Sequence, residues 1–371
     1  MLIPSYYPSV GGAGRQLESL LPFLNKERIQ SLILTRRLPG TQAREQMDGV
    51  QIIRLDAYEH TPSFLIYSFI WLVQQRDEWD LIHVHTAFSP ALVAATARWL
   101  LGKPVIVKIP SHGPKTALDQ MKSSWWGRIR LQYLCRSVNG FVVVNSAMYN
   151  ELLSIGIHDS KLFNITNGVD IDKFHPIPRT QRIRLREEHK LTDSPVVIYV
   201  GRLAPRKGIR FLVENWPSVL QKNPKTTLLI IGDGPLRNEL EKLVQNTCRE
   251  ENVRFYGDCE HNEVVRFLQL SDCFVLPSPS EGNSNALLEA MSTGLVPIVS
   301  HNEGNLEVVQ NGVNGLVFND HKSLCEQITQ CLKQDDYREE LGVTARQTVV
   351  DRFSISQTAS RLTKAYHQLL L

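Results

Sequence analysis

The chain has 371 residues and a net charge of +3, and 42% of its residues are hydrophobic against 21% charged. This length is too great for one ordinary core and predicts two domains of ordinary globular composition. Six cysteines are scattered without a C-x-x-C pair, which argues against a metal knuckle or a disulfide framework and favours a reducing cytosol. The mild charge also argues against a nucleic-acid partner.

Nothing in the sequence predicts a secretory signal or a membrane-spanning segment. The first residues carry no basic segment ahead of a long apolar stretch, and the longest apolar run, residues 64–73, is too short to cross a bilayer. We expect a cytoplasmic protein in which residues 64–73 form a buried or partly buried helix.

Short β-branched runs alternate with longer amphipathic segments, such as the helices expected at residues 14–24 and 89–101. Near-continuous apolar strands separated by helices predict parallel sheets that are covered on both faces. We therefore expect an α/β protein with two doubly wound, Rossmann-like domains facing a central cleft. The expected strands are residues 31–35, 50–55, 80–85, 104–109, 141–145 and 161–166 in the first half, and 195–201, 226–232, 253–257, 273–277, 296–300 and 315–318 in the second.

The expected domain boundary follows the turn at Asn167-Gly168. We assign residues 1–175 to the first domain and residues 195–352 to the second. The polar segment 176–194 between them predicts a linker with a short surface helix.

Ligands of open α/β sheets bind at the carboxyl ends of the strands, so the loops that follow strands are the candidate sites. After the strand at 195–201, Arg202 and Lys207 lie between Gly201 and Gly208. A guanidinium fork and an ammonium on a glycine-bounded loop suit a diphosphate. The open alternative is two solvated surface cations.

Two further loops contain glycines that would let a ligand approach the backbone closely. One is the turn that begins at Gly232, and the other is Gly11-Gly12 near the N-terminus. The spacing of G-G-A-G misses the G-x-G-x-x-G fingerprint, which counts against a nicotinamide-dependent enzyme.

The loop and helix after the strand at 273–277 contain two carboxylates. Asn283 or Ser284 is a good N-cap, so the backbone amides that follow would point into the cleft and attract phosphate. Glu289 could accept hydrogen bonds from ribose hydroxyls, and Glu281 could stabilise positive charge on a reacting sugar carbon. The open alternative is that Glu281 caps the helix and Glu289 is solvated. The backbone amides expected to point into the cleft are those of Asn285, Ala286 and Leu287.

A D-x-D sequence at Asp170 and Asp172 resembles a metal-binding motif of another sugar-transferase fold. It lies at the inferred domain boundary, so we expect no metal role for it.

Five segments in register resemble one family over nearly the whole chain. They are "YPSVGGAGRQ", "NGVDIDKF", "VGRLAPRKG", "EGNSNALLEAMSTGLVPIVS" and "EGNLEVVQNGVNGLVF". Together they are similar to the GT4-type family of retaining glycosyltransferases with the GT-B fold. The resemblance implies transfer of a sugar from a nucleoside-diphosphate sugar, with UDP- or GDP-sugars favoured, to a polysaccharide, oligosaccharide or lipid-linked acceptor in cell-envelope or exopolysaccharide biosynthesis.

The resemblance also implies roles for individual residues. Arg202 and Lys207 would neutralise the donor diphosphate, Glu281 would face the transferred sugar, and Glu289 would hold the ribose. The backbone at residues 285–287 would contact the donor, and Gly12 would close the cleft from the acceptor domain. The family implies no cofactor and no metal, and a C-terminal helix at 353–371 that packs back on the first domain.

One departure concerns a histidine that many relatives carry soon after the strand at 104–109. Pro110 or Ser111 is nearest to that place in this sequence. His112 could substitute as a catalytic residue, and His83 and His85 are further candidates. A structural role is the alternative for each.

Residues 122–136 combine two Trp, a Tyr and four basic residues. As a helix they would present apolar groups beside cations, which suits an anionic membrane surface on the inner face of the plasma membrane. The alternative is a helix packed on the sheet. The membrane candidates are Lys122, Trp125, Trp126, Arg128 and Arg130.

Two other functions remain open at this level. One is an isomerase of the sugar-nucleotide 2-epimerase type, and the other is a non-catalytic nucleotide-sugar-binding protein. The R-x4-K loop and the E-x7-E spacing favour sugar transfer over the isomerase. The joint presence of Glu281, Arg202 and Lys207 argues against the binding protein.

Overall fold

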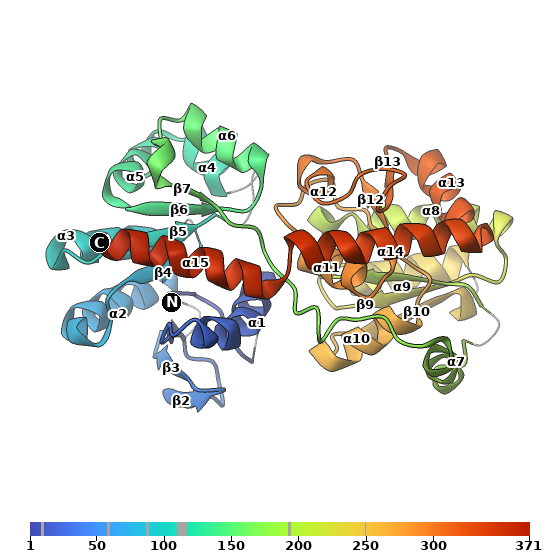
Figure 1. The fold of residues 1–371 in the computed structure, drawn as a ribbon, viewed down its shortest axis with the longest axis horizontal. Helices are drawn as coiled ribbons and strands as arrows, with labels where there is room; N and C mark the ends of the chain where they lie inside the picture. Colours follow the sequence, from blue (N-terminus) through green and yellow to red (C-terminus); the bar gives the residue numbers. More distant parts are fainter. Residues whose placement is uncertain (9–10, 58–59, 87–88, 110–116, 192–193, 249) are drawn as a thin grey trace. The chain divides into compact units, whose positions relative to one another are not determined.

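The computed structural model describes residues 1–371 except 9–10, 58–59, 87–88, 110–116, 192–193 and 249. The chain divides into two compact units, residues 1–168 with 355–371 and residues 169–354 (Figure 1). The first unit ends before the expected residue 175 because Val169 and Phe174 are buried in the core of the second unit.

The first unit contains a sheet of parallel strands with one antiparallel edge. Leu2 forms single bridges to Leu34 and Val84, so it joins the two groups of strands into one sheet. The two groups have the orders β1-β3-β2 and β4-β5-β6-β7. The strands are β1 (Leu32–Arg36), β2 (Arg44–Met47), β3 (Val50–Leu55), β4 (Ile82–Val84), β5 (Val105–Lys108), β6 (Gly140–Val143) and β7 (Leu162–Asn164).

Strand β2 was not expected from the sequence, and it pairs antiparallel with β3. The two strands are joined at Asp48 and Gly49, whose φ angles are +50° and +78°. An Asp-Gly pair with positive φ at both residues is a strong hairpin signal. The sequence therefore contained the signal for this strand.

Helices cover both faces of the first sheet. Alternate residues of β5 and β6 divide between two clusters: Ile106 and Val142 pack with α1 (Gly12–Lys26) and α15 (Ile355–Leu370), while Val107 and Phe141 face the other side. Helices α1 and α15 pack against each other (Figure 1). The other helices of this unit are α2 (Thr61–Gln74), α3 (Ser89–Leu101), α4 (Ala117–Ser123), α5 (Trp125–Ser137) and α6 (Ser146–Ser154), with short 3-10 turns at Arg76–Glu78 and Asp159–Lys161.

The second unit is built on a six-stranded, fully parallel sheet with the order β10-β9-β8-β11-β12-β13. The expected doubly wound α/β architecture is confirmed. The strand order reverses between β8 and β11, and this switch point is where such sheets bind ligands. The strands are β8 (Val196–Val200), β9 (Thr227–Ile231), β10 (Val253–Gly257), β11 (Cys273–Leu276), β12 (Val296–Ser300) and β13 (Leu316–Phe318).

Most helices of the second unit follow its strands, whereas α7 (Arg179–Glu188) precedes the first strand (Figure 1). The others are α8 (Ile209–Lys222), α9 (Arg237–Thr247), α10 (His261–Leu270), α11 (Asn285–Ser292), α12 (Glu303–Leu306), α13 (His321–Lys333) and α14 (Asp335–Arg352), with short 3-10 turns at Pro205–Lys207 and Glu250–Asn252.

The segment expected to be a linker is anchored to the second sheet through Asp272. Arg182 and Arg186 of α7 form ion pairs with the two carboxylate oxygens of Asp272 at 2.6 and 2.7 Å. The backbone N–H of Val196 donates to the same carboxylate at 2.7 Å. Burial alone would raise the pKa of Asp272, but the two Arg and this N–H together hold the pKa below its ordinary value.

Replacing Asp272 by Asn should lower the free energy of unfolding by about 3 kcal/mol near pH 7, because two partly buried guanidinium groups lose their carboxylate. The control Asp335→Asn removes an ion pair whose carboxylate side chain is 81% exposed, and it should cost less than about 1 kcal/mol. Urea unfolding measures both values.

The pH dependence gives a second check. Because the folded pKa of Asp272 is depressed, its contribution is fully present above the unfolded pKa of about 3.9 and is lost as pH falls through the folded pKa. The difference between wild type and Asp272→Asn should therefore shrink below about pH 4. A difference that stays constant as the pH falls below about 4, or equal losses in the two variants, would contradict this assignment.

Candidate functional site

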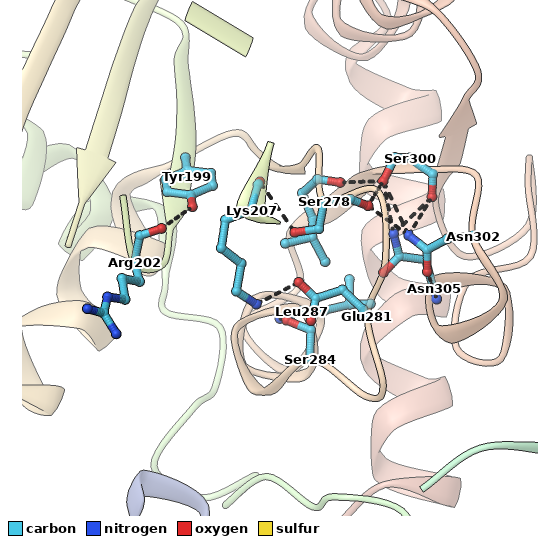
Figure 2. A network of polar contacts seen from close by, with 11 residues as sticks. Tyr199, Arg202, Lys207, Ser278, Glu281, Ser284, Leu287, Ser300, Asn302 and Asn305 are labelled. Atoms are coloured by element: carbon cyan, nitrogen blue, oxygen red, sulfur yellow. Dashed lines mark hydrogen bonds and ion pairs between the residues drawn. The ribbon is translucent and has the colours of Figure 1, made fainter. Parts of the chain in front are cut away.

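Three loops of the second unit meet at the carboxyl ends of β8, β11 and β12. They contain residues 201–208, residues 277–284, and the turn into α12. Figure 2 shows their polar contacts, with Lys207 and Glu281 near the centre of the view. These loops flank the switch point of the sheet, so the site lies where the topology predicts a ligand.

An ion pair joins the first two loops. Lys207 Nζ lies 2.6 Å from Glu281 Oε1, and the two side chains are only 19% and 8% exposed. Gly208 allows this approach, because its φ is +66° and a Cβ there would lie 2.0 Å from the Pro277 carbonyl oxygen. The structure therefore brings together the two sequence-predicted residues Lys207 and Glu281.

Arg202 is exposed, and Figure 2 shows its side chain pointing away from the Lys207–Glu281 pair. Its backbone is held by the Tyr199 hydroxyl, which donates to the Arg202 carbonyl at 3.1 Å. Gly201 and Gly232 are packed together: Gly232 has a φ of +125°, and a Cβ there would lie 2.2 Å from the Gly201 carbonyl oxygen. The two glycine-containing loops are thus adjacent.

Helix α11 begins beside Glu281. Ser284 is its N-cap, and the Ser284 hydroxyl accepts a hydrogen bond from the backbone N–H of Leu287 at 3.4 Å. The cap residue is therefore Ser284 rather than Glu281. Asn285 and Ala286 form the first turn with Leu287, whose N–H is already engaged by the cap.

Glu289 lies further along α11, and its side chain is 13% exposed. The alternative of a freely solvated carboxylate is therefore wrong. Its Oε1 lies 3.2 Å from His261 Nε2 at the start of α10.

A polar network that the sequence analysis missed supports the loop containing Glu281. The Ser278 carbonyl accepts hydrogen bonds from Ser300 Oγ and from Asn302 Nδ2, the latter at 2.9 Å (Figure 2). The Asn302 carboxamide oxygen also accepts from the Asn305 N–H at 3.0 Å and caps α12. The signal in the sequence was Asn302, two residues after the apolar strand β12, because Asn is a favoured N-cap residue.

The remaining candidates lie in the first unit. Gly12 is the exposed first residue of α1, and His112 lies outside the described residues. His83 and His85 are buried, their rings stack at 4.2 Å, and His83 Nδ1 lies 2.6 Å from the Tyr366 hydroxyl. Burial first, and then neighbouring basic groups, lower the pKa of both imidazoles well below the ordinary value. These two histidines are part of the packed interior.

The D-x-D sequence serves a local turn. Asp170 Oδ1 accepts hydrogen bonds from the backbone N–H groups of Asp172 and Lys173 at 3.0 and 3.1 Å. Within the described part of the chain, no group of three or more His, Cys, Asp or Glu side chains could hold a metal ion.

The segment expected as one helix over 122–136 is two helices, since Ser124 caps α5 by accepting from the Gly127 N–H at 3.0 Å. Lys122 lies on α4 and pairs with Glu151 at 2.6 Å. Trp125 and Trp126 are 67% and 65% exposed, and Arg128 and Arg130 lie on the same helix, α5. Across the residues whose placement is known, no helix is both long and apolar enough to cross a membrane.

Two family models match successive parts of the sequence. The model described as Glycosyltransferase Family 4 matches residues 10–173, and the model described as Glycosyl transferases group 1 matches residues 181–348. The chain belongs to the GT4-type glycosyltransferases with the GT-B fold. The resemblance expected from the sequence motifs is confirmed.

Individual relatives agree with this assignment. The transferase is 26% identical to sulfoquinovosyl transferase SQD2 of Arabidopsis thaliana, over 93% of this chain and 68% of that protein. It is 27% identical to an Escherichia coli UDP-Gal:alpha-D-GlcNAc-diphosphoundecaprenol alpha-1,3-galactosyltransferase, over 81% of this chain and 79% of that protein. The crystal structure of Anabaena HepE in complex with UDP-glucose superposes with a TM-score of 0.81 at 19% identity, over 99% of this chain and 98% of that chain.

The close approach at Gly208 predicts a stability difference between two glycine variants. Gly312 also has a positive φ, +74°, but a Cβ there would meet nothing within 4 Å. Gly312→Ala should therefore cost about 1 kcal/mol, for backbone strain alone. Gly208→Ala should cost about 3 kcal/mol, because the Cβ also displaces the Pro277 carbonyl. Urea unfolding compares the two, and equal losses would show that the loops do not depend on this contact.

Proposed function

We propose that this glycosyltransferase transfers a sugar, with retention of anomeric configuration, from a nucleoside-diphosphate sugar to a carbohydrate or lipid-linked acceptor of the cell envelope. The observation that carries the proposal is the sheltered Lys207–Glu281 ion pair at the switch point of the second sheet. It sets a cation and a carboxylate side by side where a diphosphate and its sugar would lie.

In this proposal Lys207 and Arg202 neutralise the donor diphosphate. A carboxylate about 4 Å from a phosphate oxygen would be repelled by roughly 4 kcal/mol at an effective dielectric constant near 20. Lys207, 2.6 Å from Glu281, offsets that repulsion. Exposed Arg202 adds a second positive charge on the same loop, and the N-terminus of α11 adds a partial one. These groups supply the positive charge that a divalent metal would otherwise provide.

Glu281 acts on the sugar. Its side chain is only 8% exposed, so water screens its negative charge poorly, and the carboxylate can stabilise positive charge that develops at the anomeric carbon. The acceptor hydroxyl attacks on the face that the diphosphate leaves, and the departing phosphate oxygen accepts the proton. Glu289 binds the ribose hydroxyls of the donor. UDP-sugars are favoured over GDP-sugars because two of the three relatives described above name a uridine nucleotide.

Replacing Glu281 by Gln should lower kcat for sugar transfer by about 10²- to 10³-fold, because the charge is removed with little change of shape. The variant should still show a thermal shift with whichever UDP-, GDP- or ADP-sugar stabilises the wild type. Glu214→Gln, at a 43%-exposed side chain paired with Arg210, is the control and should keep full activity.

The same assay separates the other candidate functions. Conversion of the donor sugar without any acceptor would indicate an epimerase. Donor binding with no turnover of any acceptor would indicate a non-catalytic binding protein. Unchanged turnover in Glu281→Gln would overturn the role of this residue.

The acceptor proposal includes peripheral contact with an anionic membrane. Helix α3 packs on both α2 and α5, and these three helices carry a group of exposed apolar side chains. Their sequences contain four Arg and no acidic residue. This composition suits anionic lipid, and it would make two copies of the surface repel each other. The exposed apolar residues are Ile66, Tyr67, Ile70, Trp99, Leu100, Trp125, Trp126 and Ile129.

Liposome flotation tests the membrane proposal. The wild type should float with vesicles that contain phosphatidylglycerol and not with pure phosphatidylcholine. Replacing Trp99, Trp125 and Trp126 together by Ala should reduce the floating fraction at least about tenfold, because three aromatic anchors are lost. The control replaces three exposed apolar residues of the second unit by Ala, namely Leu306, Val313 and Val343. Equal flotation of the two triple variants would count against this surface.

A further inference from the structure

His261 makes a specific contact with a residue of the proposed donor site. Its Nε2 lies 3.2 Å from Glu289 Oε1, and the two side chains are 20% and 13% exposed. A carboxylate oxygen can only accept, so the imidazole donates the hydrogen bond from Nε2. His261 is the first residue of α10, whereas Glu289 lies in the second half of α11.

The imidazole ring also packs against a buried aromatic neighbour. The Phe174 ring lies 5.1 Å from the His261 ring, between centroids, and Phe174 is 1% exposed. The Phe174 carbonyl accepts hydrogen bonds from Ser292 Oγ at 2.5 Å and from Arg346 Nη1 at 3.1 Å. The backbone of Phe174, whose ring packs on the His261 imidazole, is therefore itself fixed by hydrogen bonds.

We infer that His261 is a positioning residue that orients Glu289 toward the ribose of the nucleotide. The inference rests on the proposed function, in which Glu289 binds that ribose. With Oε1 fixed by His261, the other oxygen, Oε2, has no donor among the described residues. It is left to accept from a ribose hydroxyl.

Holding the Glu289 side chain in place before the nucleotide binds would lower the entropic cost of binding. A free glutamate side chain loses rotamer freedom when it binds a ligand, and a side chain that is already ordered avoids most of that cost. Removing His261 should therefore weaken binding only through the ribose hydroxyls. Diphosphate binding and the chemical step should be unaffected.

The test measures the affinity of the full-length protein by calorimetry for UDP and for 2′,3′-dideoxy-UDP, or for the guanosine pair if the wild type prefers GDP. His261→Ala should bind the ribonucleotide about tenfold more weakly and the dideoxynucleotide within about twofold of the wild type. His261→Gln, whose Nε2 can also donate to Glu289, should recover most of the loss. In turnover, His261→Ala should raise the donor KM about tenfold with little change in kcat.

His189→Ala is the matched control, because His189 also packs on an aromatic ring of the second unit, Phe267, at 5.0 Å. It should leave both affinities unchanged. Equal weakening of both nucleotides by His261→Ala, or none, would overturn the positioning role.

The test also distinguishes this failure from failure of the proposed function. If Glu289→Gln loses the preference for ribose and His261→Ala keeps it, only the positioning role falls. If the wild type itself does not distinguish the two nucleotides, the ribose role of Glu289 falls as well.

Discussion

The ion pair between Lys207 and Glu281 is the interaction on which the rest of the site depends. A carboxylate that is only 8% exposed is costly unless a cation lies beside it. That cation is available only because the loops after β8 and β11 touch at Gly208, where a side chain would strike Pro277. The parallel order of these strands brings the loops to the same edge of the sheet. The strand order thus brings the two loops together, Gly208 lets them touch, and this contact places Lys207 beside Glu281.

The loop that contains Glu281 is held from two directions. Lys207 holds the side chain on one side, and on the other Asn302 links the Ser278 carbonyl to the beginning of α12. Because these restraints are polar and already formed, the carboxylate would need little reorganisation in the role that we propose for it. Beside the site, Glu289 is restrained in the same manner by His261.

The fold was largely predictable because its strands are runs of apolar, β-branched residues between turn signals, and such runs depend little on context. Strand β2 was the exception, since its alternating exposed residues carry no apolar run and only Asp48-Gly49 marks the hairpin. The helix expected over 122–136 was wrong in its start, because a serine N-cap at Ser124 divides it in two.

The sequence motifs select candidate residues for the site, but they do not predict the contacts that these residues make. Motif spacing identified Lys207 and Glu281 as candidates. No local pattern predicts that their side chains touch, because they follow different strands of the sheet. The same holds for Glu289 with His261 and for Asp272 with α7, because these pairs form only when distant elements pack. Local sequence specifies which side chains a loop carries, and tertiary packing decides which of them meet.

The division of the chain makes the second unit an insertion within the first. Residues 169–354 form one continuous stretch, whereas the first unit needs both residues 1–168 and residues 355–371. Leu362 and Tyr366 of the last helix share a core with Leu20 and Leu24 of the first. A gene fragment that stops at Gly168 would therefore encode a sheet with one face only partly covered, by α1 without α15, while the inserted segment can be excised with its own core whole.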